Sequence, residues 1–600
     1  MFGSETIKEK IILSLRKAIK EKFGEEVLSE LNFELEIPPN LEFGHFSWKC
    51  FGLAKLVKKK PEQVAEDLAS FIDQLNDQIE KIVNLGGYLN FFLDKKKWFS
   101  LTITDILTKA DNFGQEKIGK GKTVLIEFSE PNPNKPMHLG HLRNTLLGAS
   151  IANLFKAIGY KTIRANLIND RGIHITKTML AYKLWGENKT PESENQKPDY
   201  FVGYFYSLFN KKVEENPKLL EQAQEILKKW EGLDQETWRL WQKVNKWAMD
   251  GFQETYRKLR IEFDKWYYES ETYKLGKEIV KTALNKNFCY QREDGAIEID
   301  LTKEGFDKKV LIRADGTSIY ITQDIGLAKL KHQEFKPDLS LYVVGSEQNY
   351  HFQILFKILE IFGFSWVKNY FHLSYGLVFL PEGKMKSREG KVVEIDQFIQ
   401  EIKLIAKAEI LKREKDILPK ELEERAEKIA LASIKFFFLK FNPKEDIYYF
   451  PEKEVSFEGA TGPYLQYTYA RIQGIIKKSL NINLDKEKEL EEKKGPKQSC
   501  LLITNNIDFS SLKSNEETCL LSLLFAFPET IKKAAFSYNP SLLANYLFDL
   551  AQKFNTFYHC CPVLSSQEKI KKARLALIVA VNQVLKNGLK ILGIEILDKM

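Results

Sequence analysis

The spacing of apolar side chains divides the chain into regions of different period. Apolar residues recur every three to four positions over 7–23 and 61–82, which predicts two helices. The segment 86–93 joins a Gly-Gly turn to a run of aromatic and apolar residues and predicts a strand. We therefore expect an α+β domain over residues 1–113, followed by a polar, glycine-containing linker over 114–122.

A different pattern begins at Thr123. A short apolar run over 124–128 predicts a buried strand, a helix pattern covers 139–158 and stops at Gly159, and a second strand follows over 162–168. The pattern repeats later as a strand at 339–344, a helix at 350–362 and a strand at 372–380. Such units build α/β domains with a doubly wound parallel sheet, Rossmann-like in kind, here expected over 118–400.

Two further regions have helical spacing. Residues 183–268 are rich in Trp, Glu and Lys and predict a helical insertion in the α/β domain. From 398 onward the pattern is almost wholly helical, with a connecting segment over 401–458 and an all-α domain over 459–600. The charge-dense stretch 484–497 predicts a solvated helix or loop.

Composition narrows the class of protein. A chain of 600 residues is too long for one ordinary domain, and 44% hydrophobic with 29% charged residues indicates a globular protein. The net charge of +8 suits a polyanionic partner without requiring one. Six cysteines without a Cys-x-x-Cys pair predict no structural zinc and reduced thiols. With no signal peptide and no long apolar run, we expect a cytoplasmic protein without a membrane segment.

The first chemical motif is His138-Leu139-Gly140-His141. Prolines up to Pro136 argue against helix, so the helix should begin near His138 and place both histidines on its first turn. That turn follows a parallel strand, where free backbone amides and the helix dipole suit a phosphate group. Gly140 lets a flat base approach the backbone. Taken alone, the motif could equally arise by chance.

The second motif is the glycine-flanked basic loop 383–391. Its residues Lys384, Met385, Lys386, Ser387 and Arg388 could close over a triphosphate and offset charge as pyrophosphate leaves. Without context, such a loop is usually solvated surface.

Together, in this order, the motifs resemble the HIGH and KMSKS signatures of class I aminoacyl-tRNA synthetases. The resemblance implies that His138 and His141 bind ATP and stabilise charge at its α-phosphate, and that Lys384 and Arg388 hold the pyrophosphate side. Arg388 stands where the second signature ends in lysine, and the two side chains are not equivalent. Some relatives without that lysine have one just before the first signature. Lys135 occupies this place, and we expect it to supply part of the phosphate contact.

The polar residues around the predicted sheet edge indicate which amino acid is the substrate. Arginine is a planar cation, so its pocket needs carboxylates and polar acceptors. Five residues match the arginine pocket of arginyl-tRNA synthetases, which the motifs at 126–132, 313–317 and 342–352 also resemble; they are Glu127, Asn132, Tyr320, Asp324 and Gln348. The resemblance implies that Asp324 binds the guanidinium, that Glu127 lies near the α-amino group, and that Asn132 and Gln348 bind the substrate backbone. Singly, each could instead be a buried, satisfied polar group.

Other segments resemble the parts of this family that contact tRNA. The segment 459–471 predicts a helix with Tyr464 and Tyr467 along one face, where aromatic rings suit unstacked bases, although a core stripe would look the same. By resemblance, Tyr558 and Met600 join them on the anticodon surface. Asn90 and Phe92 in the first domain are candidates for contact with the outer corner of the tRNA. At 170–172 the chain has Asp-Arg-Gly where the family often has Asp-Trp-Gly.

The resemblance covers nearly the whole chain. It implies an arginine–tRNA ligase that forms arginyl-adenylate from L-arginine and ATP with Mg²⁺, and then esterifies the 2′-hydroxyl of the terminal adenosine of tRNA(Arg). Such enzymes are often monomers. The alternatives are another class I synthetase, such as a cysteinyl enzyme with a zinc-binding pocket, and a catalytically silent tRNA-binding paralogue.

Overall fold

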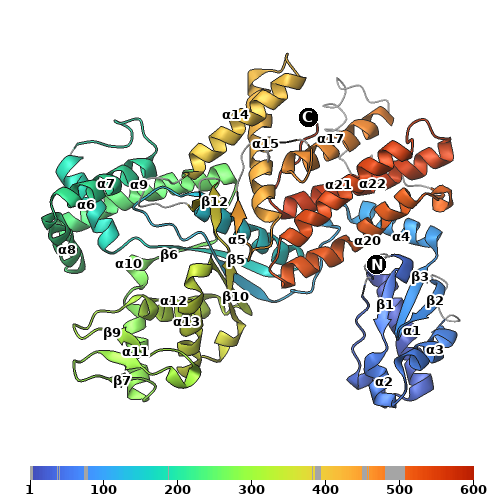
Figure 1. Cartoon of the computed structure of the whole chain (residues 1–600), viewed down its shortest axis with the longest axis horizontal. Helices are drawn as coiled ribbons and strands as arrows, with labels where there is room; N and C mark the ends of the chain where they lie inside the picture. The colour runs from blue at the N-terminus through green and yellow to red at the C-terminus, as the bar shows by residue number, and fades with distance from the viewer. Residues whose placement is uncertain are drawn as a thin grey trace.

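The computed structural model describes the chain except for residues 1–3, 37, 39–40, 73–78, 187, 381–382, 385–392, 449–455, 457 and 480–506. At its centre lies a five-stranded parallel sheet in the order β11-β10-β4-β5-β6 (Figure 1). These strands are β4 (Thr123–Glu127), β5 (Lys161–Ile168), β6 (Lys265–Tyr268), β10 (Leu339–Gly345) and β11 (Tyr370–Tyr375). The chain runs outward from β4 through β5 and β6, and then returns to add β10 and β11 on the other side of β4. The side of the sheet on which new strands are added therefore changes between β4 and β10. At such a switch point open α/β sheets bind ligands.

Helices cover both faces of the sheet. The alternating side chains of β4 show this, because Val124 and Ile126 pack in the same core as α5 (Leu139–Ala157), whereas Leu125 packs with Leu327 of α12 (Tyr320–Phe335). A third helix beside the sheet, α13 (Asn349–Ile361), packs against α12 and β11. The predicted strand–helix–strand unit is therefore confirmed, and the sheet is doubly wound.

Two insertions interrupt the sheet. The first, predicted to be helical over 183–268, contains α6 (Ile173–Trp185), α7 (Pro198–Glu215), α8 (Lys218–Glu231) and α9 (Gln235–Leu259). Its helices begin ten residues before the predicted range, and the end of that range is not helical, because residues 265–268 pair with β5 as strand β6. The second follows β6 and combines helices with an antiparallel sheet in the order β7-β8-β9. Its elements are α10 (Glu269–Thr272), α11 (Leu275–Asn285), β7 (Tyr290–Gln291), β8 (Ile297–Ile299) and β9 (Lys309–Ile312).

The C-terminal region is helical, as predicted. Its helices are α14 (Ile395–Arg413), α15 (Pro419–Leu439), α17 (Gly462–Ser479), α20 (Asn515–Phe536), α21 (Ser541–Cys560) and α22 (Glu568–Ile591). Before it, β12 (Val378–Leu380) pairs with β13 (Gly383–Lys384). The same strand also pairs with the short strand β14 (Ile447–Tyr448), which lies between α15 and α17.

The N-terminal region has the expected α+β character and packs on the helical region (Figure 1). Its antiparallel sheet β1-β3-β2 is formed by β1 (Phe46–Lys49), β2 (Ile79–Leu85) and β3 (Tyr88–Leu93), with α1 (Ser4–Phe23), α2 (Phe51–Val57), α3 (Pro61–Ile72) and α4 (Lys95–Lys109) around it. The rings of Phe46 and Trp98 lie 5.2 and 5.8 Å from that of Phe525 in α20. Lys8 forms an ion pair of 3.2 Å with Glu529 of the same helix. Aromatic packing thus joins the first and last regions of the chain.

Two predicted elements are wrong in extent. The helix predicted over 61–82 ends at Ile72, and β2 follows from Ile79 because it pairs with β3 across the Gly86-Gly87 turn. Pairing with a partner strand overrides the local spacing. The strand predicted over 372–380 is two strands in different sheets. They separate at Gly376, where a Cβ atom would lie 2.4 Å from the carbonyl oxygen of Glu445. The stretch 484–497 lies outside the described residues.

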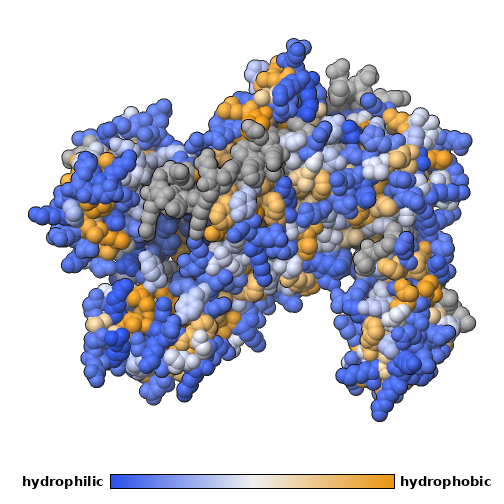
Figure 2. Space-filling view, viewed as in Figure 1, coloured by the Kyte–Doolittle hydropathy of each residue, from blue (hydrophilic) through white to orange (hydrophobic). Residues whose placement is uncertain are grey.

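Figure 2 shows a largely hydrophilic face with hydrophobic side chains in small separate groups, which is ordinary for a globular protein. Among the described helices, none combines the length and apolar character needed to cross a bilayer.

Candidate active site

The connection from β4 to α5 is held over the switch point by one asparagine. The side chain of Asn144 in α5 accepts a hydrogen bond from the N–H of Ser129 at 2.6 Å, just after β4. It also donates to the carbonyl of Val343 at 2.8 Å and to the hydroxyl of Tyr375 at 3.2 Å. Asn144 therefore ties α5 to the carboxyl ends of β4, β10 and β11.

The two histidines of the first motif form the N-terminal cap of α5. The N–H of Gly140 donates to Nδ1 of His138 at 3.1 Å, and the N–H of His138 donates to Nδ1 of His141 at 3.2 Å. Because each Nδ1 accepts a hydrogen bond, each neutral ring has its proton on Nε2. Burial lowers the pKa of His138 to about 3 and that of His141 well below its ordinary value. Two neutral Nε2–H donors at the positive end of a helix dipole suit a phosphate.

Lys135 lies beside this pair. Its positive charge contributes to lowering the pKa of both histidines, and burial lowers the pKa of the Lys135 ammonium itself. A cation so close to the helix start fits the phosphate contact expected for it.

The second motif can be located by its flanks. Met385, Lys386, Ser387 and Arg388 lie outside the described residues, and only the backbone of Lys384 is described, in β13. After the loop, the carbonyl of Val393 accepts from the N–H of Leu139 at 3.2 Å, and the N–H of Ile395 donates to the carbonyl of Met137 at 3.0 Å. These bonds join the residues that follow the second motif to the start of α5.

Arg143 was not singled out from the sequence, yet it anchors the same helix. The residue is fully buried in α5, and burial lowers the pKa of its guanidinium to about 10. Its two terminal nitrogens donate to five backbone carbonyls at 2.6–3.5 Å, those of Gly376, Leu377, Asn442, Pro443 and Glu445. Arg143 therefore fastens α5 to the segment after β11 and to the segment before β14.

The residues expected around arginine divide into an open and a buried group. Asp324 in α12 lies 2.6 Å from Nε2 of His351, three residues after Gln348, so the starts of α12 and α13 meet. Tyr320, one turn before Asp324, is 73% exposed. Gln348 and Asn132 are also exposed. A ligand that enters from solvent can therefore contact the residues of the open group.

Glu127 is the buried member. Its carboxylate pairs with the ammonium of Lys331 in α12, and the two side chains are 3% and 1% exposed. Burial raises the pKa of Glu127, and Lys331 opposes that rise. Lys331 was also missed from the sequence, although its spacing of seven residues from Asp324 places both on one face of α12. Glu127 thus lies beneath the open group, already bound to a protein cation.

Comparisons with known proteins match this arrangement. A model of the class I (R) tRNA synthetase catalytic domain matches residues 102–450, an arginyl tRNA synthetase N-terminal domain matches 6–93, and a DALR anticodon binding domain matches 465–600. An arginine–tRNA ligase of Treponema denticola is 40% identical, covering 99% of both chains. One from Bacteroides thetaiotaomicron is 38% identical, covering 99% of this chain and 100% of its own. This chain belongs to the arginyl-tRNA synthetase family.

Solved structures agree on the fold. The arginyl-tRNA synthetase of Thermus thermophilus superposes with a TM-score of 0.79 at 24% identity, covering 99% of this chain and 100% of its own. This likeness supports the architecture described above.

The tyrosines expected at the anticodon surface lie in one cluster between α17 and α21. Arg471 donates to the hydroxyl of Tyr467 at 2.9 Å and to Asn555 at 2.8 Å, and Asn555 donates to the hydroxyl of Tyr464 at 2.8 Å. The ring of Tyr558, 38% exposed, lies 5.8 Å from the Arg471 guanidinium. Aromatic rings around a cation suit bases and phosphates.

The remaining candidates for tRNA contact are Met600 and two residues of the N-terminal sheet. Met600 is partly buried against the main hydrophobic core. Asn90 is only 4% exposed and accepts a hydrogen bond from Ser47 at 2.8 Å within the N-terminal sheet. Phe92, on the same strand, is half-buried under the ammonium of Lys81 at 4.5 Å. Of these three residues, Asn90 has a side chain that is already hydrogen-bonded inside the N-terminal domain.

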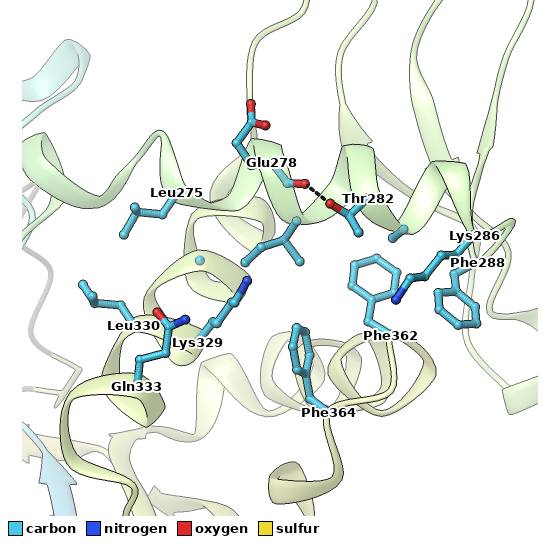
Figure 3. A pocket seen from close by; sticks show the side chains of 13 residues that line it. Leu275, Glu278, Thr282, Lys286, Phe288, Lys329, Leu330, Gln333, Phe362 and Phe364 are labelled. Atoms are coloured by element: carbon cyan, nitrogen blue, oxygen red, sulfur yellow. Dashed lines mark hydrogen bonds between the residues drawn. The ribbon is translucent and has the colours of Figure 1, made fainter.

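A separate hollow of about 330 Å³ lies between α11 and α12 (Figure 3). Residues of α11 and α12 line it, with Phe288, Phe362 and Phe364 at one end. None of the candidate site residues lines this hollow.

Proposed function

We propose that the carboxyl edge of the parallel sheet carries the arginine–tRNA ligase activity of this family member. In the first step, the carboxylate of L-arginine attacks the α-phosphorus of ATP, the bond to the β-phosphate oxygen breaks, and pyrophosphate leaves. In the second, the terminal 2′-hydroxyl of tRNA(Arg) attacks the adenylate carbonyl and AMP leaves. Both steps rely on positioning and charge stabilisation.

The observation that carries the proposal is the pair of Nε2–H donors at the start of α5. Their Nδ1 atoms are occupied by backbone N–H groups, so the two Nε2–H groups remain to bind oxygens of the α-phosphate. Gly140 leaves room for the nucleotide, while Lys135 and the loop residues Lys384 and Arg388 offset charge on the leaving pyrophosphate. Magnesium accompanies the phosphates of ATP.

Arginine lies across the starts of α12 and α13. Asp324 binds the guanidinium, Tyr320 flanks it, and Asn132 and Gln348 bind the amino-acid backbone. Glu127 positions Asp324 indirectly, because its ion pair with Lys331 holds the face of α12 that bears Asp324. The cluster Tyr464, Tyr467 and Tyr558, with Met600, meets the anticodon loop. The strand that bears Phe92 and Asn90 meets the outer corner of the tRNA. The enzyme works as a cytoplasmic monomer.

One assay tests the proposal against its rivals. Bulk tRNA is charged with each radiolabelled amino acid in turn, and we expect arginine alone to be esterified. Charging with another amino acid would indicate a different class I synthetase, and no charging at all would indicate a silent tRNA-binding protein. Matched His138→Asn and His174→Asn variants locate the reaction, because His174 lies in α6, hydrogen-bonded to Tyr206 and outside the proposed site. Only the first should lose activity.

A further inference from the structure

Glu130 is a carboxylate at the sheet edge, and the part of the chain that the structure describes offers its Oε1 atom no partner. It follows β4 by three residues, and its Oε1 atom is sealed from solvent without a hydrogen-bond partner among the described residues. Its backbone N–H donates to Asn166 at 3.0 Å, and its φ of 48° is in the left-handed region. The position is thus fixed by the backbone, while the side chain is left free to bind a ligand.

The charged groups around Glu130 do not neutralise the negative charge of its carboxylate. Three ionisable groups act on its carboxylate most strongly, namely Glu127, Lys331 and Asp324. Lys331 is already paired with Glu127, and Asp324 with His351. Burial and the two neighbouring carboxylates raise the pKa of Glu130 well above its ordinary value. An unpaired buried carboxylate is costly unless a cation arrives with the ligand.

L-Arginine has two cationic groups, and Glu130 and Asp324 are two carboxylates at this edge that form no ion pair with a lysine or arginine of the described residues. The α-ammonium is attached next to the reacting carboxylate, so its partner must lie near the α-phosphate. Glu130 lies on the connection that leads from β4 to His138, whereas Asp324 lies across the sheet edge on α12. The two ends of the substrate therefore match the two carboxylates in order.

We propose that Glu130 binds the α-ammonium group of arginine, while Asp324 binds the guanidinium at the other end. This inference rests on the proposed function. It adds a specificity-determining residue, because a ligand with a guanidinium but no α-amino group would leave Glu130 buried and unpaired.

The test compares L-arginine with 5-guanidinopentanoate, which lacks only the α-amino group. Equilibrium dialysis of the full-length protein with labelled L-arginine gives its dissociation constant, and competition gives that of the analogue. The variants are Glu130→Gln, Glu130→Asp and a matched control, Glu262→Gln, whose side chain is 86% exposed in the same domain. We expect the wild type and the control to prefer arginine by about 10- to 100-fold, as for a hydrogen-bonded charge pair.

The preference, not the affinity alone, decides the outcome. Glu130→Gln should bind the two ligands within about threefold of each other, and Glu130→Asp should show an intermediate preference, a result that simple loss of packing would not give. If both variants weaken the two ligands equally, or leave the preference intact, the inference is wrong. If Glu130→Gln does not fold, Glu130→Asp decides by the same ratio. Failure of the proposed function would look different, since the wild type itself would not bind arginine.

Discussion

Replacing Lys331 by methionine would expose how much the site depends on its buried ion pair. Methionine keeps most of the volume in α12 but removes the cation, so the Glu127 carboxylate, 3% exposed, loses its partner. Breaking a buried pair by removing one member costs about 3–5 kcal/mol. At about 2 °C per kcal/mol for a large domain, the melting temperature should fall by roughly 6–10 °C.

The pH dependence of the loss identifies its cause. Without Lys331, burial and the neighbouring carboxylates keep the pKa of Glu127 raised, so the folded variant takes up a proton that the unfolded chain, with an ordinary carboxyl pKa, does not hold at neutral pH. Taking up that proton becomes easier as pH falls. The deficit of the variant relative to wild type should therefore be largest at pH 7–8 and shrink toward pH 5.

Thermal unfolding followed by fluorescence over pH 5–8 measures both effects. The double variant Glu127→Gln/Lys331→Met is the control, because it removes both charges and should recover at least half of the lost stability. A fall below 2 °C in the single variant, or no recovery in the double variant, would refute the buried pair as the support of α12.

Three further perturbations test other parts of the account. Lys135→Ala should slow tRNA-dependent ATP–pyrophosphate exchange at least tenfold with little change in the KM for arginine, since the lost contact is to phosphate; unchanged exchange would remove Lys135 from the site. Arg143→Lys should lower the melting temperature by several degrees, because one ammonium cannot serve five carbonyls, and an unchanged melting curve would contradict this. Glu130→Gln should raise the melting temperature of the ligand-free protein, because an unpaired buried carboxylate with a raised pKa destabilises the fold above pH 4.5, whereas a decrease would indicate a structural role.

Local patterns predicted the elements whose cause is local. The proline-rich approach to His138 set the start of α5, and the apolar runs at 124–128 and 339–344 identified two strands of the central sheet. The division of 61–82 into α3 and β2 depends on pairing with β3, and the break at Gly376 depends on contact with Glu445, 69 residues later in the chain. Such long-range contacts leave no mark in local spacing.

The candidate site shows the same division. Residues in motifs, such as His138 and His141, could be found from the sequence because the neighbouring residues belong to the same motif. Lys331, Arg143 and Glu130 are single residues whose roles arise from burial beside distant partners. Glu127 was singled out for the ligand, yet its environment shows a carboxylate already bound to Lys331. Only the fold reveals which charges remain unpaired.

The central claim is that one edge of the sheet holds the nucleotide at the histidine pair and arginine at Asp324. A structure of the protein with a stable arginyl-adenylate analogue tests it most directly. The account predicts the phosphate mimic within hydrogen-bond distance of Nε2 of His138 and His141, with the guanidinium on the Asp324 carboxylate. An analogue bound elsewhere, or with its guanidinium away from α12, would contradict it.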